Sequence, residues 1–562
     1  MKKIVIGVAA LATTFIVSGT ALGLWIAAER SERNSLLSRI ERKATAYFRS
    51  AVTSDSASES EIITNRLPLI KRVVNMPLMV TDSGGGIAAA PGGGVLLLDR
   101  LGGLFYHVDG QTSELRIDTP DNGIEDLDRR HASGEFGDRG FRKRGFRFND
   151  VLVLARGNAF ELFISYSDWE PDRLCYRSVL AQATIPSDLA VADWVVDEND
   201  WRELKVTEPC LPINPTGWVT VQGIEAGGRL AEVSDTELVW STGVYELDDS
   251  FKETGIEPFA QRDESDYGRV LKIDFRSGDT EVLARGLRNP QGLTRSSDGT
   301  IFVADHGMRG GDELNVVDPD QPEYNFGWPF VSYGTHYNGK PVHSSGRHSG
   351  HDGYDLPAIA FAPSIAPGSA LFLENFHPVW DGDILIGAFR GTIERIHLVN
   401  GRAILAEPIG IEVRPRDMAL TEDREIVIWT DNLQLIFLTP RRAPSAMDRM
   451  LASIDQIADD GTRKDAAGAM EGCLQCHSLS KGENQAGPSL HGICGSRMGS
   501  VAGFDQYSEA LASSRQTWTE DLLAEFIMAP QSIVPDTSMA WEGTQSIETA
   551  ATIAGLICSN RD

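Results

Sequence analysis

The feature that most constrains the fold of this chain is a pattern that recurs between residues 77 and 440. A polar turn containing glycine, aspartate or asparagine precedes a short apolar strand, and a second turn leads to another apolar strand. Clear apolar runs of this kind are 95–98, 300–303, 384–386 and 425–429. Four-stranded units that repeat at intervals of about 45–60 residues are typical of a β-propeller. We therefore predict an all-β propeller of about six blades over residues 77–440, with a β-sandwich or two unrelated β domains as the alternative.

The first residues of the chain predict a membrane anchor. Between Ile4 and Ala28 the only polar side chains are Thr and Ser, and at about 1.5 Å per residue such a run reaches roughly 37 Å, enough to cross a bilayer. A cleaved signal peptide usually has an apolar region of only about 7–15 residues, so we expect residues 1–28 to be retained as a transmembrane helix, with cleavage as the alternative. Lys2 and Lys3 favour an N-terminus in the cytoplasm.

Residues 29–76 are expected to form a helical stalk that holds the body of the protein in the periplasm. Apolar side chains recur there at spacings of three and four, which is the period of an amphipathic helix. They are Leu36, Leu37, Ile40, Ala44 and Phe48. The formal charge of −28, from 80 acidic and 52 basic residues, repels nucleic acid and excludes it as a partner.

Two cysteines and a histidine form the C-x-x-C-H motif Cys473-Leu474-Gln475-Cys476-His477. In this pattern the two thiols form thioethers to haem and the adjacent His ligates the iron. The motif predicts one covalently attached haem c, on the outer side of the inner membrane. A redox C-x-x-C motif beside a bystander His is the alternative.

The other four cysteines are expected to form disulfides, which an oxidising compartment permits. Cys494 with Cys558 would join the haem loop to the last helix, and Cys175 with Cys210 would close a loop inside the propeller. Free buried thiols are the alternative.

Residues 465–562 resemble class I cytochromes c of the mitochondrial type, and the polar residues 441–464 before them are expected to be a linker. The resemblance rests on the haem motif, Gly487-Pro488, the Thr-Trp-Thr at 517–519 and Pro535-Asp536-Thr537-Ser538-Met539, in that order. It implies an all-α domain.

The same resemblance implies the ligands of the haem iron. His477 is the proximal ligand and donates a hydrogen bond to Pro488, Trp518 binds a haem propionate, and Met539 is the second axial ligand. A thioether opposite His favours the reduced iron, which suits a domain that accepts electrons. The competing thioethers are Met528, expected in the core, and Met498, expected at the surface.

Three pieces of the predicted propeller resemble the glucose/sorbosone dehydrogenase family, whose six-bladed propellers include the soluble pyrroloquinoline quinone (PQQ) sugar dehydrogenases. They are residues 286–293, 303–315 and 325–329, in that order. The clear resemblance covers about residues 220–435, with weaker support back to about residue 80.

The resemblance implies a PQQ site at the centre of the propeller. PQQ carries three carboxylates, and Arg suits paired hydrogen bonds to a carboxylate better than Lys does. The family's cofactor contacts fall on Arg288, Asn289, Gln291, Arg390, Arg414, Arg416 and Asp431.

The resemblance also implies a Ca²⁺ ion beside the cofactor, held partly by backbone carbonyls. The family has Gly-Pro at the position of Gly307-Met308, and a hard cation accepts carbonyl oxygens whatever the side chain. The ion would polarise the quinone carbonyl. Asp312 and Glu313 assist the site or close a turn. His343, His348 and His351 are expected in a solvated loop.

The position of the catalytic base departs from the family. Its enzymes show His-x-x-Gly-Arg-Leu, whereas this chain has Glu225-Ala226-Gly227-Gly228-Arg229-Leu230. A carboxylate can also take the proton of a sugar hydroxyl, so Glu225 is the candidate base, with Arg288 as the second candidate catalytic residue. The alternative is that Glu225 pairs with Arg229 or another cation.

The sequence thus predicts a periplasmic quinohaemoprotein, anchored in the inner membrane, that oxidises a sugar or related alcohol or aldehyde at PQQ and passes electrons to its own haem. The downstream acceptor is expected to be a soluble cytochrome or a terminal oxidase. The alternative is an electron-transfer or redox-sensing cytochrome whose propeller is a non-catalytic binding platform.

Overall fold

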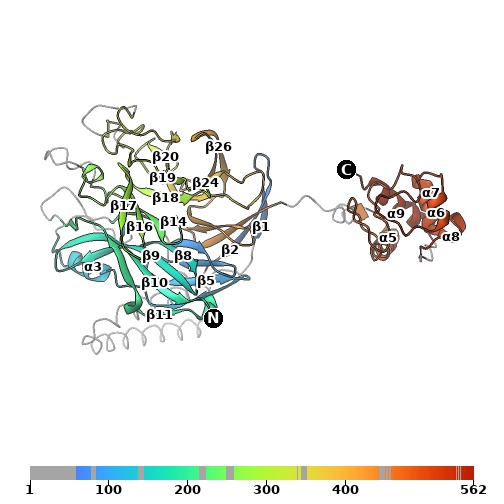
Figure 1. The fold of residues 1–562 in the computed structure, drawn as a ribbon, viewed down its shortest axis with the longest axis horizontal. Coiled ribbons are helices and arrows are strands. Elements are labelled where there is room, and N and C mark those ends of the chain that lie inside the picture. The colour runs from blue at the N-terminus through green and yellow to red at the C-terminus, as the bar shows by residue number, and fades with distance from the viewer. Residues whose placement is uncertain are drawn as a thin grey trace, which may run out of the picture. The chain divides into compact units, whose positions relative to one another are not determined.

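The computed structural model describes residues 58–76, 84–136, 145–213, 223–247, 258–337, 339–342 and 351–441, and most of 450–561. The chain divides after Arg441 into two compact units (Figure 1). The expected anchor, residues 1–28, lies outside the described residues. Within the ranges given above, the helices are all too short or too polar to cross a bilayer.

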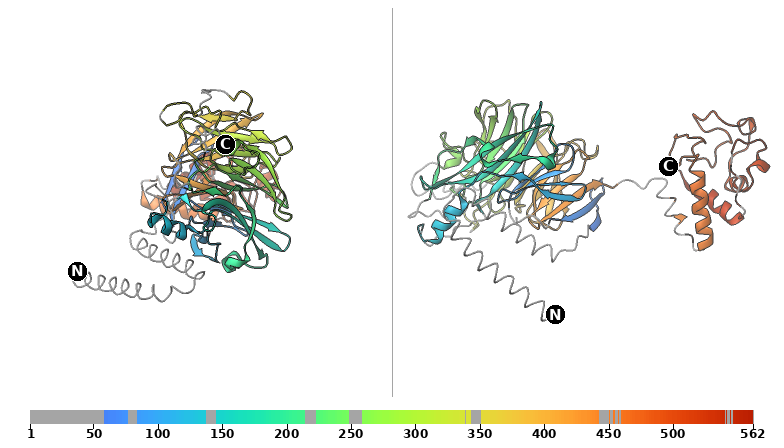
Figure 2. Two further views of the ribbon diagram at one scale, coloured as in Figure 1. Left: turned by 90° about the vertical axis from the view of Figure 1, so that its left-hand side faces the viewer. Right: turned by 90° about the horizontal axis from the view of Figure 1, so that it is seen from below.

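The first unit is a β-propeller of six sheets, each with four or five strands (Figures 1 and 2). The strands of each blade are given from the inner strand outwards. The first blade consists of β3 (Gly86–Ala89), β4 (Val95–Leu98), β5 (Leu104–Val108) and β6 (Gln111–Glu114), and the second of β8 (Phe148–Arg156), β9 (Ala159–Glu170), β10 (Cys175–Pro186) and β12 (Arg202–Val206), with β13 (Leu211–Pro212) also paired to β10. The third consists of β14 (Gly227–Glu232), β15 (Glu237–Thr242), β16 (Arg269–Asp274), β17 (Thr280–Arg285) and β21 (Tyr324–Asn325).

The other three blades complete the ring. They are β18 (Pro290–Arg295), β19 (Ile301–Asp305), β20 (Asp312–Val317) and β22 (Ile359–Phe361); β23 (Pro367–Phe372), β24 (Ile384–Ala388), β25 (Thr392–Val399) and β26 (Arg402–Gly410); and β27 (Pro415–Leu420), β28 (Ile426–Thr430), β29 (Gln434–Pro440), β2 (Leu69–Asn75) and β1 (Ser58–Ile62). Outside the blades, β7 (Arg116–Ile117) pairs in parallel with β11 (Val195–Val196), and α3 (Ile124–Ala132) is a short helix.

The inner strands close the ring, because β3, β8, β14, β18, β23 and β27 each contact the next and β27 contacts β3. Strands within the blades are covered on both faces. Every residue of β4, β19 and β28 is therefore buried, which explains why these strands are continuous apolar runs. The predicted six-bladed propeller is confirmed.

The last blade corrects one prediction. Residues 58–62 and 69–75 were expected in a helical stalk, but they are strands, and β2 pairs along its whole length with β29 (Figure 1). The β-branched residues Ile70, Val73 and Val74 and the charged pair between them suit a half-buried strand near the edge of a sheet. The propeller therefore begins near residue 58 and not at residue 77.

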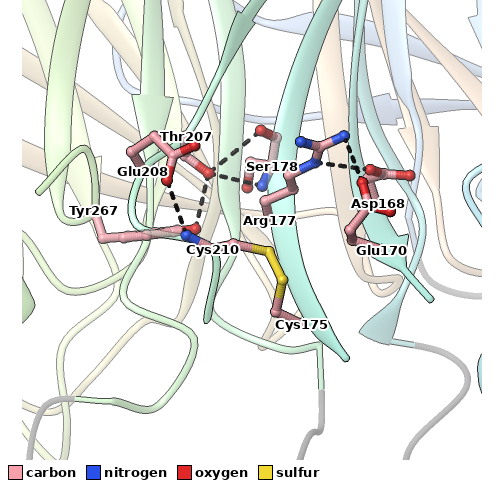
Figure 3. The surroundings of a disulfide bond; sticks show 9 residues. All are labelled: Asp168, Glu170, Cys175, Arg177, Ser178, Thr207, Glu208, Cys210 and Tyr267. Atoms are coloured by element: carbon pink, nitrogen blue, oxygen red, sulfur yellow. Dashed lines mark hydrogen bonds and ion pairs between the residues drawn. A yellow bond between two sulfur atoms is a disulfide. The ribbon is translucent and has the colours of Figure 1, made fainter. Parts of the chain in front are cut away.

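Both expected disulfides are present. Cys175 at the start of β10 is bonded to Cys210, 35 residues later, and Figure 3 shows this bond beside Ser178, Thr207 and Tyr267. Thr207 donates a hydrogen bond of 2.9 Å to the Tyr267 hydroxyl. Cys494 is bonded to Cys558 across 64 residues.

The second unit is all-α. Its helices are α5 (Asp460–Cys473), α6 (Glu509–Ser513), α7 (Glu520–Met528), α8 (Pro530–Ile533) and α9 (Ile547–Ser559), and α9 packs against α5 and α7. Two expectations are corrected here. Met450 and Ile454, placed in the linker, belong to the core of this unit, and Met498, expected at the surface, is fully buried in it, where its sulfur accepts a hydrogen bond from Ser514.

Candidate functional site

The inner strands of the propeller all begin near one central side chain, that of Arg229 on β14. Its guanidinium donates to the carbonyl oxygens of Gln291 on β18 (2.9 Å), Gly368 on β23 and Arg416 on β27 (both 2.8 Å). Each acceptor is the second residue of its strand. The starts of the inner strands therefore form one pole of the propeller, which we call the N-terminal pole.

Two buried carboxylates balance the charge of Arg229. Asp150 on β8 lies 3.2 Å from the guanidinium, and Asp417 on β27 lies 2.8 Å from it. Asp417 also accepts the backbone N–H of Ile87 on β3, so this cluster links all six inner strands. Burial, followed by the nearby Asp417, raises the pKa of Asp150 well above its ordinary value. No local sequence pattern singles out Asp150.

Glu225 lies at this pole, just before the start of β14 at Gly227. Its backbone has φ 62°, in the left-handed region, and its buried carboxylate forms an ion pair with Arg288. The guanidinium of Arg288 also donates to the carbonyl oxygens of His306 (2.9 Å) and Gly307 (3.1 Å). Of the two expected pairings for Glu225, the cation is thus Arg288 and not Arg229.

Asn289 and Gln291 hold the start of β18 in place beside this ion pair. Asp305 accepts the backbone N–H groups of Arg288 (2.9 Å) and Asn289 (2.7 Å). The amide of Gln291 donates to the side-chain oxygen of Asn289 (3.0 Å) and to the carbonyl of Gly227 (3.1 Å). The sequence motif 288–291 therefore forms one rigid corner of the pole.

Arg414 and Arg416 meet around Phe389. Their guanidinium carbons lie 4.7 and 4.4 Å from the centre of its ring. Arg416 makes a two-pronged contact with Asp431, at 2.9 and 2.8 Å, and Arg414 lies 3.7 Å from the same carboxylate. Sequence reasoning missed Phe389, although it stands directly before the assigned Arg390.

Arg390 does not join this group. Its side chain is 40% exposed and forms an ion pair of 2.9 Å with Glu394, and it also donates to the hydroxyl of Thr392. All seven residues expected to bind PQQ therefore lie at the N-terminal pole, but the side chain of Arg390 is paired with Glu394 of its own blade.

His306 lies among the arginines of the pole. Burial, followed by Arg288, Arg414 and Arg416, lowers the pKa of His306 to about 3. The ring of His306 packs edge-on to Phe389, with centroids 6.5 Å apart. His306 is therefore neutral at physiological pH. The three arginines each have a carboxylate nearby, and their guanidinium donors fit an anionic cofactor such as PQQ.

The expected Ca²⁺ ligands do not fit a cation in this arrangement. The Gly307 carbonyl accepts from the Arg288 guanidinium, and the Met308 carbonyl accepts from the Gly311 N–H (3.1 Å) and the Ser364 hydroxyl (3.0 Å). Across the part of the chain that the structure describes, there is also no group of three or more His, Cys, Asp or Glu side chains that could hold a metal.

The neighbouring acidic residues and histidines have other roles. Asp312 accepts the backbone N–H groups of Ile365 and Ala366, both at 2.7 Å, and so closes a turn. His343 and His348 lie outside the described residues. His351 was expected in solvent, but it is buried against Tyr333 and lies 3.5 Å from Glu313.

The haem motif lies at the end of α5. His477 follows its last turn, and Nδ1 of its ring lies 2.7 Å from the carbonyl oxygen of Pro488. Because that oxygen can only accept, Nδ1 donates and Nε2 is left for iron, as the sequence predicts. A Cβ at Gly487 would lie only 2.4 Å from the His477 ring, so only glycine fits beside it.

Two thioethers that could ligate a haem iron lie at one hollow of the second unit. Met539 and Met528 both line a hollow of about 510 Å³, together with Trp541. Met528 also packs on the core, as expected, and Trp518 is buried against Phe526, with ring centroids 5.0 Å apart. The choice between Met539 and Met528 as ligand stays a prediction.

Comparisons with known proteins agree with both halves of this description. Residues 166–437 match the family of glucose/sorbosone dehydrogenases. The chain is 33% identical over 242 residues to an uncharacterized protein of Synechocystis sp., a match that covers 38% of this chain and 56% of that protein. It is 42% identical over 85 residues to cytochrome c2 of Rhodopila globiformis, covering 15% of this chain and 79% of that protein.

Among solved structures, the soluble aldose sugar dehydrogenase of Escherichia coli, in its apo form, shares the fold of the propeller. The superposition has a TM-score of 0.50 at 20% identity and covers 66% of this chain and all of that one. The chain spans little more than half the length of the Synechocystis relative.

Proposed function

Because residues 166–437 of this chain are a glucose/sorbosone dehydrogenase domain and its C-terminal end belongs to the cytochrome c family, we propose that it is a quinohaemoprotein dehydrogenase. It oxidises a sugar or a related alcohol or aldehyde at PQQ, and it passes the electrons to its own haem c. The haem would accept the electrons that substrate oxidation leaves on PQQ, so each redox centre would have a function beside the other.

The observation that carries the proposal is the group of arginines at the N-terminal pole. Burial, followed by Arg288, Arg414 and Arg416, lowers the pKa of His306 to about 3. A ligand that brings several carboxylates can accept charge-assisted hydrogen bonds from such a group. Phe389 packs against two of these arginines and so helps to fix their guanidinium groups.

The chemistry divides between the cofactors and the residues. When bound, PQQ would accept a hydride from the substrate carbon, and the haem iron would accept electrons singly. Glu225 would take the proton of the substrate hydroxyl, so that the substrate loses two electrons and two protons in all. Arg288 positions that carboxylate through their ion pair. Asn289, Gln291, Arg414 and Arg416 would hold the anionic cofactor.

In the second unit Cys473 and Cys476 would carry the haem, with His477 and Met539 as axial ligands. The hydrogen bond from His477 to Pro488 fixes the ring with Nε2 available to iron. We further propose that residues 1–28 attach the protein to the inner membrane, with both units in the periplasm and a soluble cytochrome or terminal oxidase as acceptor.

Titration of the purified full-length chain with PQQ tests this function. We expect calorimetry to show binding, with and without added Ca²⁺, and we expect an aldose to reduce the haem only after PQQ is present. Absence of PQQ binding in both conditions would overturn the proposal and favour a propeller that serves as a binding platform.

A further inference from the structure

The turn that follows β15 holds the backbone of both members of the Glu225–Arg288 ion pair. Residues 243–245 make this turn directly after the strand ends. The backbone N–H of Val244 donates to the carbonyl oxygen of Arg288 (3.0 Å), and that of Tyr245 donates to the carbonyl oxygen of Glu225 (3.0 Å). Two adjacent donors of one turn therefore fix the proposed base and the cation that pairs with it.

The backbone of this turn fits closely against Glu225. The N–H of Gly243 donates to the carbonyl oxygen of Ala226 (2.9 Å), and a Cβ built on Gly243 would lie 2.0 Å from the carbonyl oxygen of Glu225. Only glycine fits there. Tyr245 has φ 53°, a left-handed conformation that is uncommon for a bulky residue. Such a backbone persists only where the surrounding contacts hold it in place.

The side chain of Tyr245 anchors the turn in the neighbouring blade. Its hydroxyl oxygen lies 2.9 Å from the hydroxyl of Ser167 on β9 and 2.7 Å from that of Ser178 on β10, and all three residues are buried. A phenol can donate one hydrogen bond and accept another, so both contacts form together. The ring also packs edge-on against Tyr176, with centroids 5.2 Å apart. Burial raises the pKa of Tyr245 above its ordinary value of 10.0, so the hydroxyl keeps its proton.

We propose that Tyr245 is a positioning residue for the reaction at the N-terminal pole. Its hydroxyl ties the turn to β9 and β10, and the turn holds Glu225 where its carboxylate meets Arg288. The inference rests on the proposed function, in which Glu225 takes the proton of the substrate hydroxyl. No sequence motif includes Tyr245, because its serine partners lie 78 and 67 residues before it, in another blade.

Loss of this anchor should affect the base more than the binding of the cofactor. A general base acts only within hydrogen-bond reach of the proton that it takes, and a displacement of about 1 Å can lower turnover about 10²-fold. The backbone N–H of Arg288 also donates to Asp305 (2.9 Å), so Arg288 keeps a second support. We therefore expect a turnover defect with PQQ affinity retained.

Tyr245→Phe removes the hydroxyl and keeps the ring. In the full-length chain loaded with haem and PQQ, we expect kcat for haem reduction by an aldose to fall about ten- to hundredfold. KM and PQQ affinity should change by less than about threefold. The matched control is Tyr267→Phe, because Tyr267 is a buried tyrosine of the same cluster, with ring centroids 6.0 Å from Tyr245, whose hydroxyl accepts from Thr207 (Figure 3). This control should lose similar thermal stability but keep kcat within about threefold.

A triple variant separates positioning from stability. In Tyr245→Phe combined with Ser167→Ala and Ser178→Ala, the three hydroxyls of the anchor are all absent, so none of them stays buried without a partner. The unfolding temperature should then return toward that of the wild type, whereas kcat should stay as low as in Tyr245→Phe. Recovery of kcat together with stability would overturn the inference.

Hydrogen exchange of the backbone amides of residues 243–245, measured by mass spectrometry without PQQ, tests the anchor independently of activity. We expect exchange to be faster in Tyr245→Phe and in the triple variant, but not in Tyr267→Phe. Unchanged exchange, or wild-type kcat in Tyr245→Phe, would overturn the inference while the proposed function stood. A wild-type chain that shows no PQQ-dependent haem reduction would instead remove the proposed function itself.

Discussion

A single side-chain contact decides how Glu225 can act. Its carboxylate forms an ion pair with Arg288, and the left-handed backbone at φ 62° fixes where that carboxylate lies. The resembling enzymes place an imidazole here, which needs no counter-ion. In this chain the proposed base and one proposed cofactor-binding cation are therefore coupled, and a change to one alters the electrostatic surroundings of the other.

This coupling makes Glu225→Gln informative. We expect substrate-driven haem reduction to fall by about 10²–10⁴-fold, the usual contribution of a general base. PQQ affinity should hold or rise, because Arg288 loses its competing carboxylate. Stopped-flow absorbance of the haem and calorimetry measure the two effects. The control Glu394→Gln, which frees Arg390, should leave turnover within threefold, and equal turnover in both variants would remove Glu225 from the mechanism.

The two thioethers at the haem give a second prediction for single residues. Met539→Ala should abolish the far-red absorption band of Met-ligated ferric haem and lower the reduction potential, because the thioether favours reduced iron. Met528→Ala should keep the band. Since both side chains line the same hollow, retention of the band in Met539→Ala together with its loss in Met528→Ala would exchange their roles.

Within one blade, the ionisation of Asp312 at the start of β20 should make the free energy of unfolding depend on pH. Burial raises its pKa to about 6, although two backbone N–H groups act in the opposite direction. The folded state thus holds this proton more tightly than the unfolded chain does. Its contribution to stability is complete below the ordinary value of 3.8 and is lost as the pH rises through 6.

Asp312→Asn tests this sign. An amide oxygen can accept the same two hydrogen bonds that now reach one carboxylate oxygen, but it does not titrate. We expect the variant to gain up to about 3 kcal/mol over wild type as the pH rises from 4 to 7. Urea unfolding at several pH values measures the difference, and a constant offset would show that Asp312 does not titrate in this range.

The elements show what sequence can predict. Strands such as β19 and β28 are fully buried apolar runs bounded by turns, so their existence follows from local pattern. The pairing of β2 with β29 joins residues more than 350 positions apart by backbone bonds, and no local pattern reports such a partner. The helical spacing of apolar residues is found only further upstream, between Leu36 and Phe48. Residues 58–75 were assigned to the same helical stalk although they do not show it.

The same limit applies to the site. Arg288, Asn289 and Gln291 were found because they are contiguous, and the structure confirms that they meet at the pole. Asp150 comes from another blade, and only the closed ring brings it near Arg229. The motif that assigned Arg390 to the cofactor ends at Arg390. It therefore does not include Glu394, the residue with which Arg390 pairs.

At the scale of the whole molecule, we expect charge to influence the choice of electron acceptor. Residues 465–562 contain 12 Asp and Glu against 4 Lys and Arg. We therefore expect a physiological acceptor with a basic surface. The rate at which a basic cytochrome oxidises the reduced haem should fall steeply as salt rises from about 0.01 to 0.3 M, since the Debye length shrinks. A rate independent of salt would exclude docking by charge.

The shared last blade has a mechanical consequence. The chain enters the propeller through β1 and β2 and leaves it through β29, and β2 and β29 are hydrogen-bonded neighbours. A pull on the two segments that flank the propeller therefore acts first within this blade, on the β1–β2 and β2–β29 ladders of backbone bonds. The other five blades lie outside this path, and β27, which brings Arg416 to the N-terminal pole, is separated from β29 by β28.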